Sequence, residues 1–177
     1  HLSFFFGLVL RNFTNTTQLK MKRRLLLFLL LLAAGLLPAQ PPYTVESIPD
    51  PKAGAERGYV SNPDGILSEA DVATLNRRIA AIEDSATAQI AVVIIQSIGQ
   101  ENPKDFAYRL FQHWGIGQAD TDNGLLIFSV MDQRRTEFET GYGLEAVLPD
   151  AICYRIGMQE LAPYFREGQY GQGLIAA

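Results

Sequence analysis

The sequence contains a single cysteine, Cys153, so no disulfide can form within one chain. An oxidising compartment is still compatible, because a domain of this length can bury an adequate core without disulfides. Histidine is also scarce, and His113 is the only one beyond the first residue. A cysteine nucleophile needs a base, and one histidine cannot form the usual zinc site. We therefore expect Cys153 to be packed in the core and His113 to be solvated.

Two loop motifs of common enzyme folds are also missing. The sequence has no Gly-x-Ser-x-Gly elbow and no Walker A loop. Residues 141–146 do match the G-x-G-x-x-A form of a dinucleotide-binding fingerprint. That fingerprint belongs to a parallel βαβ unit, however, whereas the strand before residue 141 is predicted to pair in the antiparallel sense. We therefore expect no nucleotide ligand.

Acidic residues are absent from the first 40 positions, where a basic segment at 21–24 precedes an apolar run at 25–37. This pattern, followed by the small residue Ala39, is typical of a secretory signal peptide, and the run is too short for a comfortable membrane span. We predict a signal peptide at 21–39 and treat residues 1–20 as upstream sequence. The protein should be exported to the periplasm or cell envelope; an uncleaved membrane anchor is the alternative.

The chain beyond residue 40 is strongly acidic. Residues 1–40 contain five of the 15 basic residues and none of the 19 acidic ones, so 10 minus 19 leaves a net charge of −9. Nucleic-acid affinity comes largely from lysine and arginine contacts with phosphates. We therefore expect no nucleic-acid partner, and a divalent cation is a better candidate ligand.

The apolar periodicity predicts one small α/β domain at 59–177, preceded by an extended, proline-rich leader at 40–58. Amphipathic spacing predicts helices at 69–84, 103–114 and 149–161, the last interrupted or restarted by Pro163. Dense β-branched or alternating residues predict strands at 89–98, 124–131 and 136–142. This order indicates a small mixed sheet covered by helices. The last residues look like a helix cut short, so we expect the native chain to continue.

Two loops rich in glycine and acidic residues flank the predicted hairpin. Residues 120–124 lead into its first strand, and residues 141–145 follow its second. A two-residue turn at 133–134 would place Asp122 opposite Glu145, with Cβ atoms about 4.5–5.5 Å apart. Five oxygen-bearing side chains would then converge: Asp120, Asp122, Asn123, Glu145 and Asp150.

Oxygen ligands of this kind suit hard cations such as Ca²⁺ and Mg²⁺. Without a cation, carboxylates this close repel one another, so at least one should have a raised pKa. An EF-hand is excluded because, counted from Asp120, glycine is fifth and Met131 is twelfth, whereas that loop needs glycine sixth and glutamate twelfth. Gly141 and Gly143 are expected to free the backbone conformation beside the acids. Ordinary turn-forming acids are the alternative to a cation site.

Several ordered motifs resemble those of a known family. They include Tyr-Val-Ser-Asn-Pro-Asp-Gly at 59–65, Asp-Asn-Gly-Leu-Leu at 122–126, Gly-Tyr-Gly-Leu-Glu at 141–145 and Pro-Tyr-Phe-Arg-Glu-Gly at 163–168. From about residue 59 to the end, the chain resembles the TPM domain family, named after thylakoid, photosystem-repair and membrane-associated members. The resemblance implies an α/β fold, a three-layer α/β/α sandwich with a small mixed β-sheet covered by helices on both faces. Such domains are usually exported and often tethered to a membrane.

The resemblance also implies a site and two activities. Some members are described as calcium-binding and a plant member as an acid phosphatase. By matching position, the acidic cluster of the family falls on Asp120, Asp122, Asn123, Glu145 and Asp150. Many members have aspartate where this chain has Asn62, which still offers an oxygen but no charge, and Asn62 completes the expected metal ligands.

Two functional hypotheses follow. The first is an exported, monomeric module that binds a divalent cation, with Ca²⁺ preferred to Mg²⁺, and assists an envelope or membrane protein partner. The second is metal-assisted hydrolysis of phosphate monoesters, with Asp120 or Asp122 as metal ligand or nucleophile. Convergent acids without an evident nucleophile favour the binding module.

Overall fold

The structure is a computed structural model that describes residues 22–24, 41–53, 58–86, 88–117 and 120–177. Apart from residues 22–24, the predicted signal peptide lies outside the described residues. The chain divides into two units, His1–Pro41 and Pro42–Ala177, and all elements named below belong to the second. Within the described ranges, no helix is both long enough and apolar enough to cross a bilayer.

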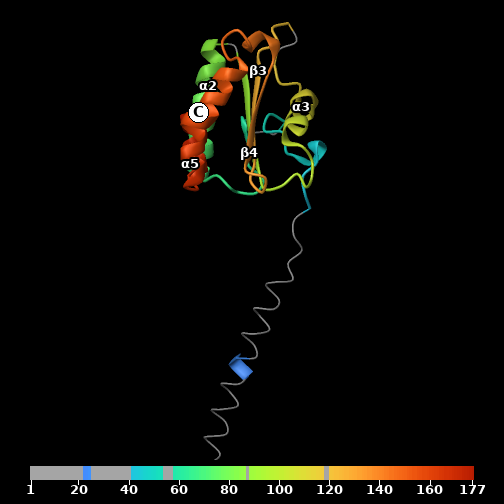
Figure 1. Cartoon of the computed structure of the whole chain (residues 1–177), viewed down its shortest axis with the longest axis vertical. Helices are drawn as coiled ribbons and strands as arrows, with labels where there is room; N and C mark the ends of the chain where they lie inside the picture. Colours follow the sequence, from blue (N-terminus) through green and yellow to red (C-terminus); the bar gives the residue numbers. More distant parts are fainter. Residues whose placement is uncertain (1–21, 25–40, 54–57, 87, 118–119) are drawn as a thin grey trace, which may run out of the picture. The chain divides into compact units, whose positions relative to one another are not determined.

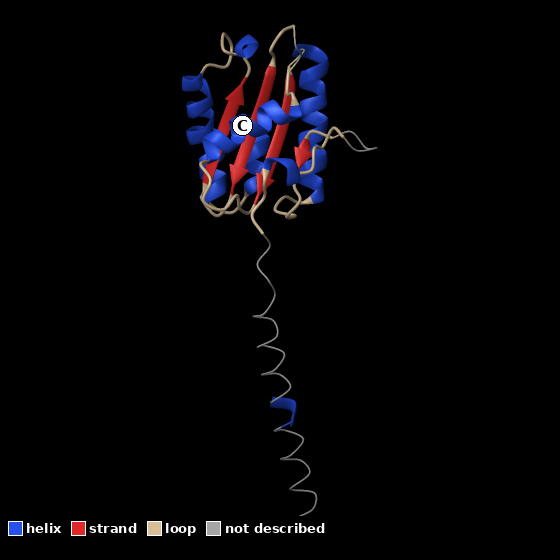
Figure 2. Ribbon diagram, turned by 90° about the vertical axis from the view of Figure 1, so that its right-hand side faces the viewer, coloured by secondary structure: helices blue, strands red, loops and turns tan. Residues whose placement is uncertain are grey.

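A four-stranded mixed sheet forms the centre of the second unit, with the strands side by side in the order β1-β2-β3-β4 (Figure 2). The strands are β1 (Val60–Ser61), β2 (Gln89–Ile95), β3 (Gly124–Val130) and β4 (Arg135–Thr140). The first three run parallel, and β4 is antiparallel to β3. All of β3 and nearly all of β2 are buried, as parallel strands covered on both faces should be. The two-residue β1 was not predicted, because it is too short to show a periodic pattern.

Helices cover both faces of the sheet, which confirms the three-layer α/β/α sandwich (Figure 1). One face carries α3 (Pro103–Trp114) and the short 3₁₀ helix η1 (Val45–Ser47). The other face carries α2 (Glu69–Ala86), the π-helical segment η3 (Gly157–Leu161), α5 (Ala162–Arg166) and α6 (Tyr170–Ala176). The helix α4 (Asp150–Ile156) leads into η3, and the 3₁₀ helix η2 (Tyr142–Leu144) follows β4.

Each face of the sheet has its own hydrophobic core. Leu126 and Phe128 of β3 face α3, and the Phe128 ring stacks on that of Phe106 with 5.2 Å between centroids. Leu125 and Ile127 face the opposite core, under α2. Because successive strand residues point to opposite faces, the continuous apolar run of β3 supplies both cores.

The helix α3 begins and ends where the sequence predicted. Its N-cap Asn102 accepts hydrogen bonds through Oδ1 from the N–H groups of Lys104 at 2.9 Å and Asp105 at 3.3 Å. Gly115 ends the helix in the left-handed conformation, with φ of 59°. His113 is exposed on this helix and Cys153 is a buried free thiol, as expected for both.

The predicted extended leader at 40–58 is wrong for residues 42–48, which pack on the domain. Val45 and Ile48 are buried in the core beneath α3. The N–H of Tyr43 also donates to the Ser97 carbonyl at 2.9 Å. The prolines of this segment limit regular secondary structure. They do not prevent apolar side chains from packing, and the sequence pattern could not show that.

The predicted helix at 149–161 is divided in a way the sequence did not reveal. Regular α-helix ends at Ile156, and a π-helical segment follows before Pro163 occupies the first turn of α5. Proline lacks an N–H and its ring clashes with the carbonyl four residues earlier, so the wider turn accommodates it. The predicted break at 168–171 occurs at Gly168, with φ of 74°, whereas Gly171 lies inside α6.

Candidate functional site

The predicted β3–β4 hairpin is present, but its turn is longer than expected. Four residues, 131–134, separate the strands instead of two, and Arg134 adopts a left-handed φ of 52°. The two additional residues shift the pairing of the strands by two positions. Gly143, rather than Glu145, therefore lies opposite Asp122, as shown by the 2.9 Å bond from the Gly143 N–H to the Asp122 carbonyl.

The two acidic loops nevertheless lie side by side at the N-terminal end of β3. The N–H of Gly141 donates to the Gly124 carbonyl at 2.9 Å, which extends the strand ladder into the loops. The side chain of Asp122 then crosses to the other loop, where its Oδ2 accepts a hydrogen bond from the N–H of Tyr142 at 3.1 Å. The Asp122 carboxylate thus holds the two loops together, a role that the sequence did not predict.

Glycine is required in the second loop by close approach of the first. A Cβ atom on Gly141 would lie 2.2 Å from the Asp122 carbonyl oxygen, and one on Gly143 would lie 1.9 Å from that of Thr121. The φ of Gly141 is −73°, which any residue can adopt. Conformational freedom, the predicted reason for glycine here, is therefore not the reason at Gly141; lack of space is.

Asp122 itself adopts the left-handed conformation, with φ of 47°. Aspartate and asparagine tolerate this conformation better than most residues, because their short side chains form local hydrogen bonds. Here the bond to the N–H of Tyr142 serves that purpose. The position of this carboxylate is therefore fixed by both its backbone and its partner.

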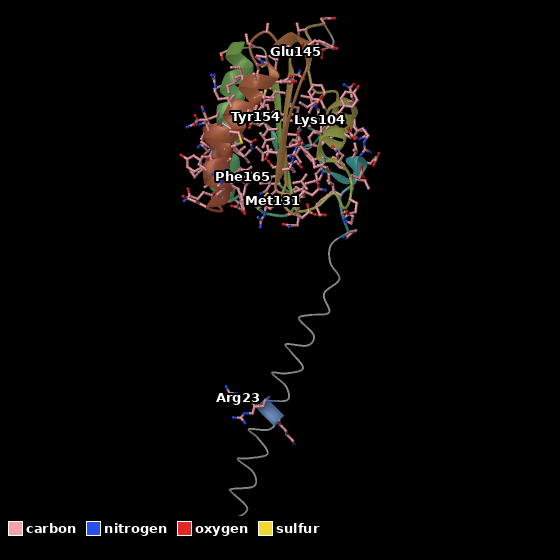
Figure 3. The ribbon with its side chains drawn as sticks, in the orientation of Figure 1. Arg23, Lys104, Met131, Glu145, Tyr154 and Phe165 are labelled. Atoms are coloured by element: carbon pink, nitrogen blue, oxygen red, sulfur yellow. The ribbon has the colours of Figure 1, made fainter. Side chains whose placement is uncertain are left out.

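The other predicted ligands lie in different surroundings. Asp120 and Glu145 are exposed in the two loops, and Asn123 is buried beside Gly124. Figure 3 shows Glu145 at one end of the sheet and Met131, in the hairpin turn, at the other. Asp150 is the exposed first residue of α4.

Asn62 is separated from all of these residues. It follows the C-terminal end of β1. Because β1 and β3 run in the same direction, this end points away from the N-terminal end of β3, where the acidic loops lie. The seven residues of β3 span about 20 Å. The Oδ1 of Asn62 accepts hydrogen bonds from the N–H groups of Ile66 at 2.8 Å and Leu67 at 3.1 Å. Asn62 therefore shapes its own turn and does not join Asp122 in one site.

A carboxyl group outside the predicted set has a raised pKa. Burial raises the pKa of Glu139 on β4, the negative charges of Asp150 and Glu137 raise it further, and Lys104 opposes them. Sequence reasoning missed Glu139 because the alternation of β4 assigned it to an exposed face. Among the described residues, no three acidic, histidine or cysteine side chains are already arranged to hold a metal ion.

These observations define the class of protein as an α/β/α sandwich with paired acidic loops at one edge of a mixed sheet. A family model described as the TPM domain matches residues 60–177. The chain therefore belongs to the TPM domain family, which confirms the resemblance seen in the sequence.

Solved structures that are similar to this chain include three determined by NMR. The solution structure of the N-terminal domain of a P. gingivalis protein is 39% identical, with a TM-score of 0.71, and the match covers 77% of this chain and 87% of that one. An N-terminal domain from Corynebacterium glutamicum has 17% identity, a TM-score of 0.55 and coverage of 76% and 81%. A protein from the psychrophilic bacterium Bizionia argentinensis has 18% identity, a TM-score of 0.56 and coverage of 64% and 77%. The last two show the fold alone. No curated protein matches the chain.

Proposed function

We propose that this TPM domain binds a divalent cation, Ca²⁺ in the first instance, between the loops at 120–123 and 141–145. The observation that supports the proposal is the fixed carboxylate of Asp122, held by its left-handed backbone and by the N–H of Tyr142. Asp120 and Glu145 are exposed on the same two loops and supply further carboxylates. Hard cations take such oxygens together with backbone carbonyls and water.

The cation has to gather its ligands as it binds. The described residues contain no preassembled group of three acidic side chains, so Asp120 and Glu145 must move toward Asp122. Of the other oxygen-bearing residues of the predicted set, Asn123 is buried within the first loop and Asp150 follows the second loop in the sequence, whereas Asn62 is excluded by its position. Because ordering side chains reduces affinity, we expect a dissociation constant of about 10⁻⁴–10⁻³ M, the range of extracellular calcium modules.

The test is a Ca²⁺ titration of residues 41–177 followed by amide NMR. We expect the N–H signals of Tyr142 and Gly143 to shift, and Asp122→Asn to weaken binding at least tenfold. Asparagine retains the acceptor for Tyr142 and tolerates the left-handed φ, so this variant removes charge without removing the loop structure. Asp132→Asn in the exposed hairpin turn is the matched control and should bind normally. Absence of any shift in these loops at millimolar Ca²⁺ would refute the proposal.

Metal-assisted phosphate-ester hydrolysis is the alternative, and the geometry supports it less. Beside the metal ion, arginine or lysine side chains commonly stabilise the negative charge of a phosphoryl group during its transfer. Arg134 and Arg135 lie at the opposite end of the hairpin from Asp122, and the salt bridges of the described residues do not reach the acidic loops. A phosphate-ester assay with wild-type protein and Asp122→Asn distinguishes the two functions. Turnover that is abolished by the substitution would favour the enzyme.

We also propose that the protein acts outside the cytoplasm, as a monomeric module for an envelope or membrane protein. The basic and apolar segments at 21–39 support this placement, because they have the composition of a signal peptide. Mass spectrometry of the protein recovered from the cell envelope should find a mature chain that begins near Gln40. An intact chain beginning at Met21 in the cytosolic fraction would contradict it.

A further inference from the structure

The strand β4 lies at the edge of the sheet and leaves half of its backbone groups unpaired. The bond from the Gly141 N–H to the Gly124 carbonyl fixes which residues face β3. Because antiparallel partners alternate, the odd-numbered residues of β4 turn their N–H and C=O groups toward β3. Thr136, Phe138 and Thr140 turn theirs outward, and no hydrogen bond within the described ranges reaches those groups.

A cavity of about 960 Å³ lies against residues 135–138 of this edge strand. The side chain of Phe138 contributes to its strand side, and the helical side includes Tyr154, Met158 and Phe165, of which the first two are well exposed. Figure 3 shows Lys104, from α3, on one side of the sheet and Tyr154 and Phe165 on the other. The cavity is therefore a groove with an open strand edge and an apolar wall.

The groove is cationic although the domain is acidic. Its basic lining residues are Lys104, Arg134, Arg135 and Arg166. Its acidic lining residues are Glu137 and Asp150. The groove thus has four of the 10 basic residues beyond position 40 and only two of the 19 acidic ones. Arg135 forms a salt bridge with Glu137 at 3.0 Å. The salt bridges among the described residues do not involve Arg134 or Arg166, so these two side chains can pair with a ligand. The resulting positive electrostatic potential in the groove favours an acidic ligand.

We propose that the β4 edge is a docking site for an extended, acidic peptide segment of a partner protein, which adds a fifth strand to the sheet. The peptide backbone pairs with the outward groups of Thr136, Phe138 and Thr140. Its alternate side chains enter the apolar part of the groove, and its carboxylates approach Arg134 and Arg166. Strand addition of this kind obtains affinity from main-chain hydrogen bonds and specificity from pockets for alternate side chains. The inference gives the proposed interaction module a partner class, but it does not depend on cation binding.

A peptide fits the groove better than a small anion does. Inorganic phosphate could approach the same arginines, but it would leave the three outward pairs of backbone groups on β4 without a strand partner and the apolar wall uncovered. An extended chain satisfies both, because its N–H and C=O groups repeat with the spacing of the strand and its side chains alternate. The carboxylates of the peptide supply the negative charges that pair with the arginines.

The first test is an amide NMR titration of residues 41–177 with a synthetic heptapeptide of alternating glutamate and valine. We expect the N–H signals of Thr136, Phe138 and Thr140 to shift and their hydrogen exchange to slow. The same peptide with its alternate, strand-pairing amides N-methylated should bind at least tenfold more weakly, and so should a lysine-valine peptide. Equal binding of the N-methylated peptide, shifts confined to other surfaces, or no shift at millimolar peptide would overturn the proposal.

The second test changes the groove. Arg134→Asn combined with Arg166→Gln removes two charges, and asparagine tolerates the left-handed φ at position 134. We expect about five- to tenfold weaker peptide binding, as two solvent-exposed ion pairs would give. Arg155→Gln, on the exposed surface of α4 outside the groove, should bind like the wild type. Unchanged NMR signals of the β2 core show that each variant is folded.

The remaining outcomes are also decisive. Phosphate that shifts the β4 signals when the peptide does not would assign the groove to a small anion. Sedimentation that shows self-association, mapped to β4 by NMR, would assign the edge to a second copy of the chain. Either result overturns the peptide proposal. Failure of the cation proposal is seen separately, because Ca²⁺ is followed at Tyr142 and Gly143, at the other end of the hairpin.

Discussion

The two ends of the β3–β4 hairpin are built in opposite ways. At one end, the acidic loops approach so closely that neither Gly141 nor Gly143 has room for a Cβ atom, and backbone hydrogen bonds join the loops. At the other end, a four-residue turn that includes Arg134 opens onto a groove of about 960 Å³. A closed, acidic end suits a small cation that binds oxygen atoms from both loops. An open, cationic edge suits a larger ligand that brings its own hydrogen bonds.

The largest expected difference between the acidic loops and the β4 edge is in the hydrogen-exchange rates of their backbone amides. The N–H groups of Gly141 and Gly143 are bonded to the opposite loop, whereas those of Thr136, Phe138 and Thr140 face outward. Paired amides exchange only when the structure opens, at a cost of several kcal/mol, but unpaired edge amides exchange from the folded state. We expect NMR exchange rates to differ by at least about 10³-fold. Comparable protection of the two sets would mean that β4 is not a free edge.

Adding one methyl group should affect the two regions in opposite directions. Gly143→Ala places its Cβ 1.9 Å from the Thr121 carbonyl oxygen, and backbone atoms must move to relieve the overlap. We expect the free energy of unfolding to fall by about 2–3 kcal/mol. Gly157→Ala is the matched change beside the groove, where the new Cβ meets the Phe138 ring at an ordinary 3.5 Å. It should raise the unfolding free energy by about 0.5–1 kcal/mol, because alanine replaces glycine within a helix.

Urea denaturation of the two glycine variants provides the measurement, with the wild type as reference. If Gly143→Ala is as stable as wild type, the second acidic loop is not held against the first, and the fixed position of Asp122 is lost as an argument. If Gly157→Ala destabilises the protein, the helical wall of the groove is packed more tightly than its spacing indicates.

Loss of the hydrogen bond by which Asp122 joins the two loops should have a smaller effect on stability. Asp122→Ala removes the acceptor for the Tyr142 N–H and leaves a residue that tolerates a φ of 47° poorly. We expect a loss of about 1–2 kcal/mol in unfolding free energy. Asp122→Asn retains both features and should lose less than about 0.5 kcal/mol. Equal losses for alanine and asparagine would show that the charge, rather than the hydrogen bond, holds the loops together.

The fold was largely predictable because its central elements have long, regular patterns. The β-branched run of β2 and the apolar stripe of α3 each predicted an element within a few residues of its observed bounds. The short strand β1 has no such pattern, and the packing of Val45 and Ile48 depends on contacts distant in sequence. Local periodicity cannot report contacts of that kind.

The candidate site was predicted in composition but not in geometry. The polar sequence around Gln133 is compatible with both a two-residue and a four-residue turn. The longer turn forms with Arg134 in the left-handed conformation, which the sequence pattern does not specify. This longer turn moves Glu145 away from its expected position opposite Asp122 and brings Gly143 there instead. The groove was not predicted at all, because it forms only where the helices after Asp150 fold back along β4.

The smallest expected effect concerns the pH dependence of Glu139, which lies on β4 between the two ends. Burial raises the pKa of this carboxyl group in the folded state, with the nearby negative charges of Asp150 and Glu137 adding to it. A raised pKa means that ionisation opposes folding, so this cost is absent below the ordinary value near 4.5 and develops as pH rises through the folded-state pKa. Glu139→Gln removes the cost and should stabilise the protein at neutral pH by about 0.5 kcal/mol or less. Denaturation at pH 7 should therefore favour the variant, whereas the difference should vanish at pH values below the ordinary pKa. The exposed Glu160→Gln is the control and should show neither effect, so a gain in both variants would trace the stabilisation to overall charge instead of to the β4 edge.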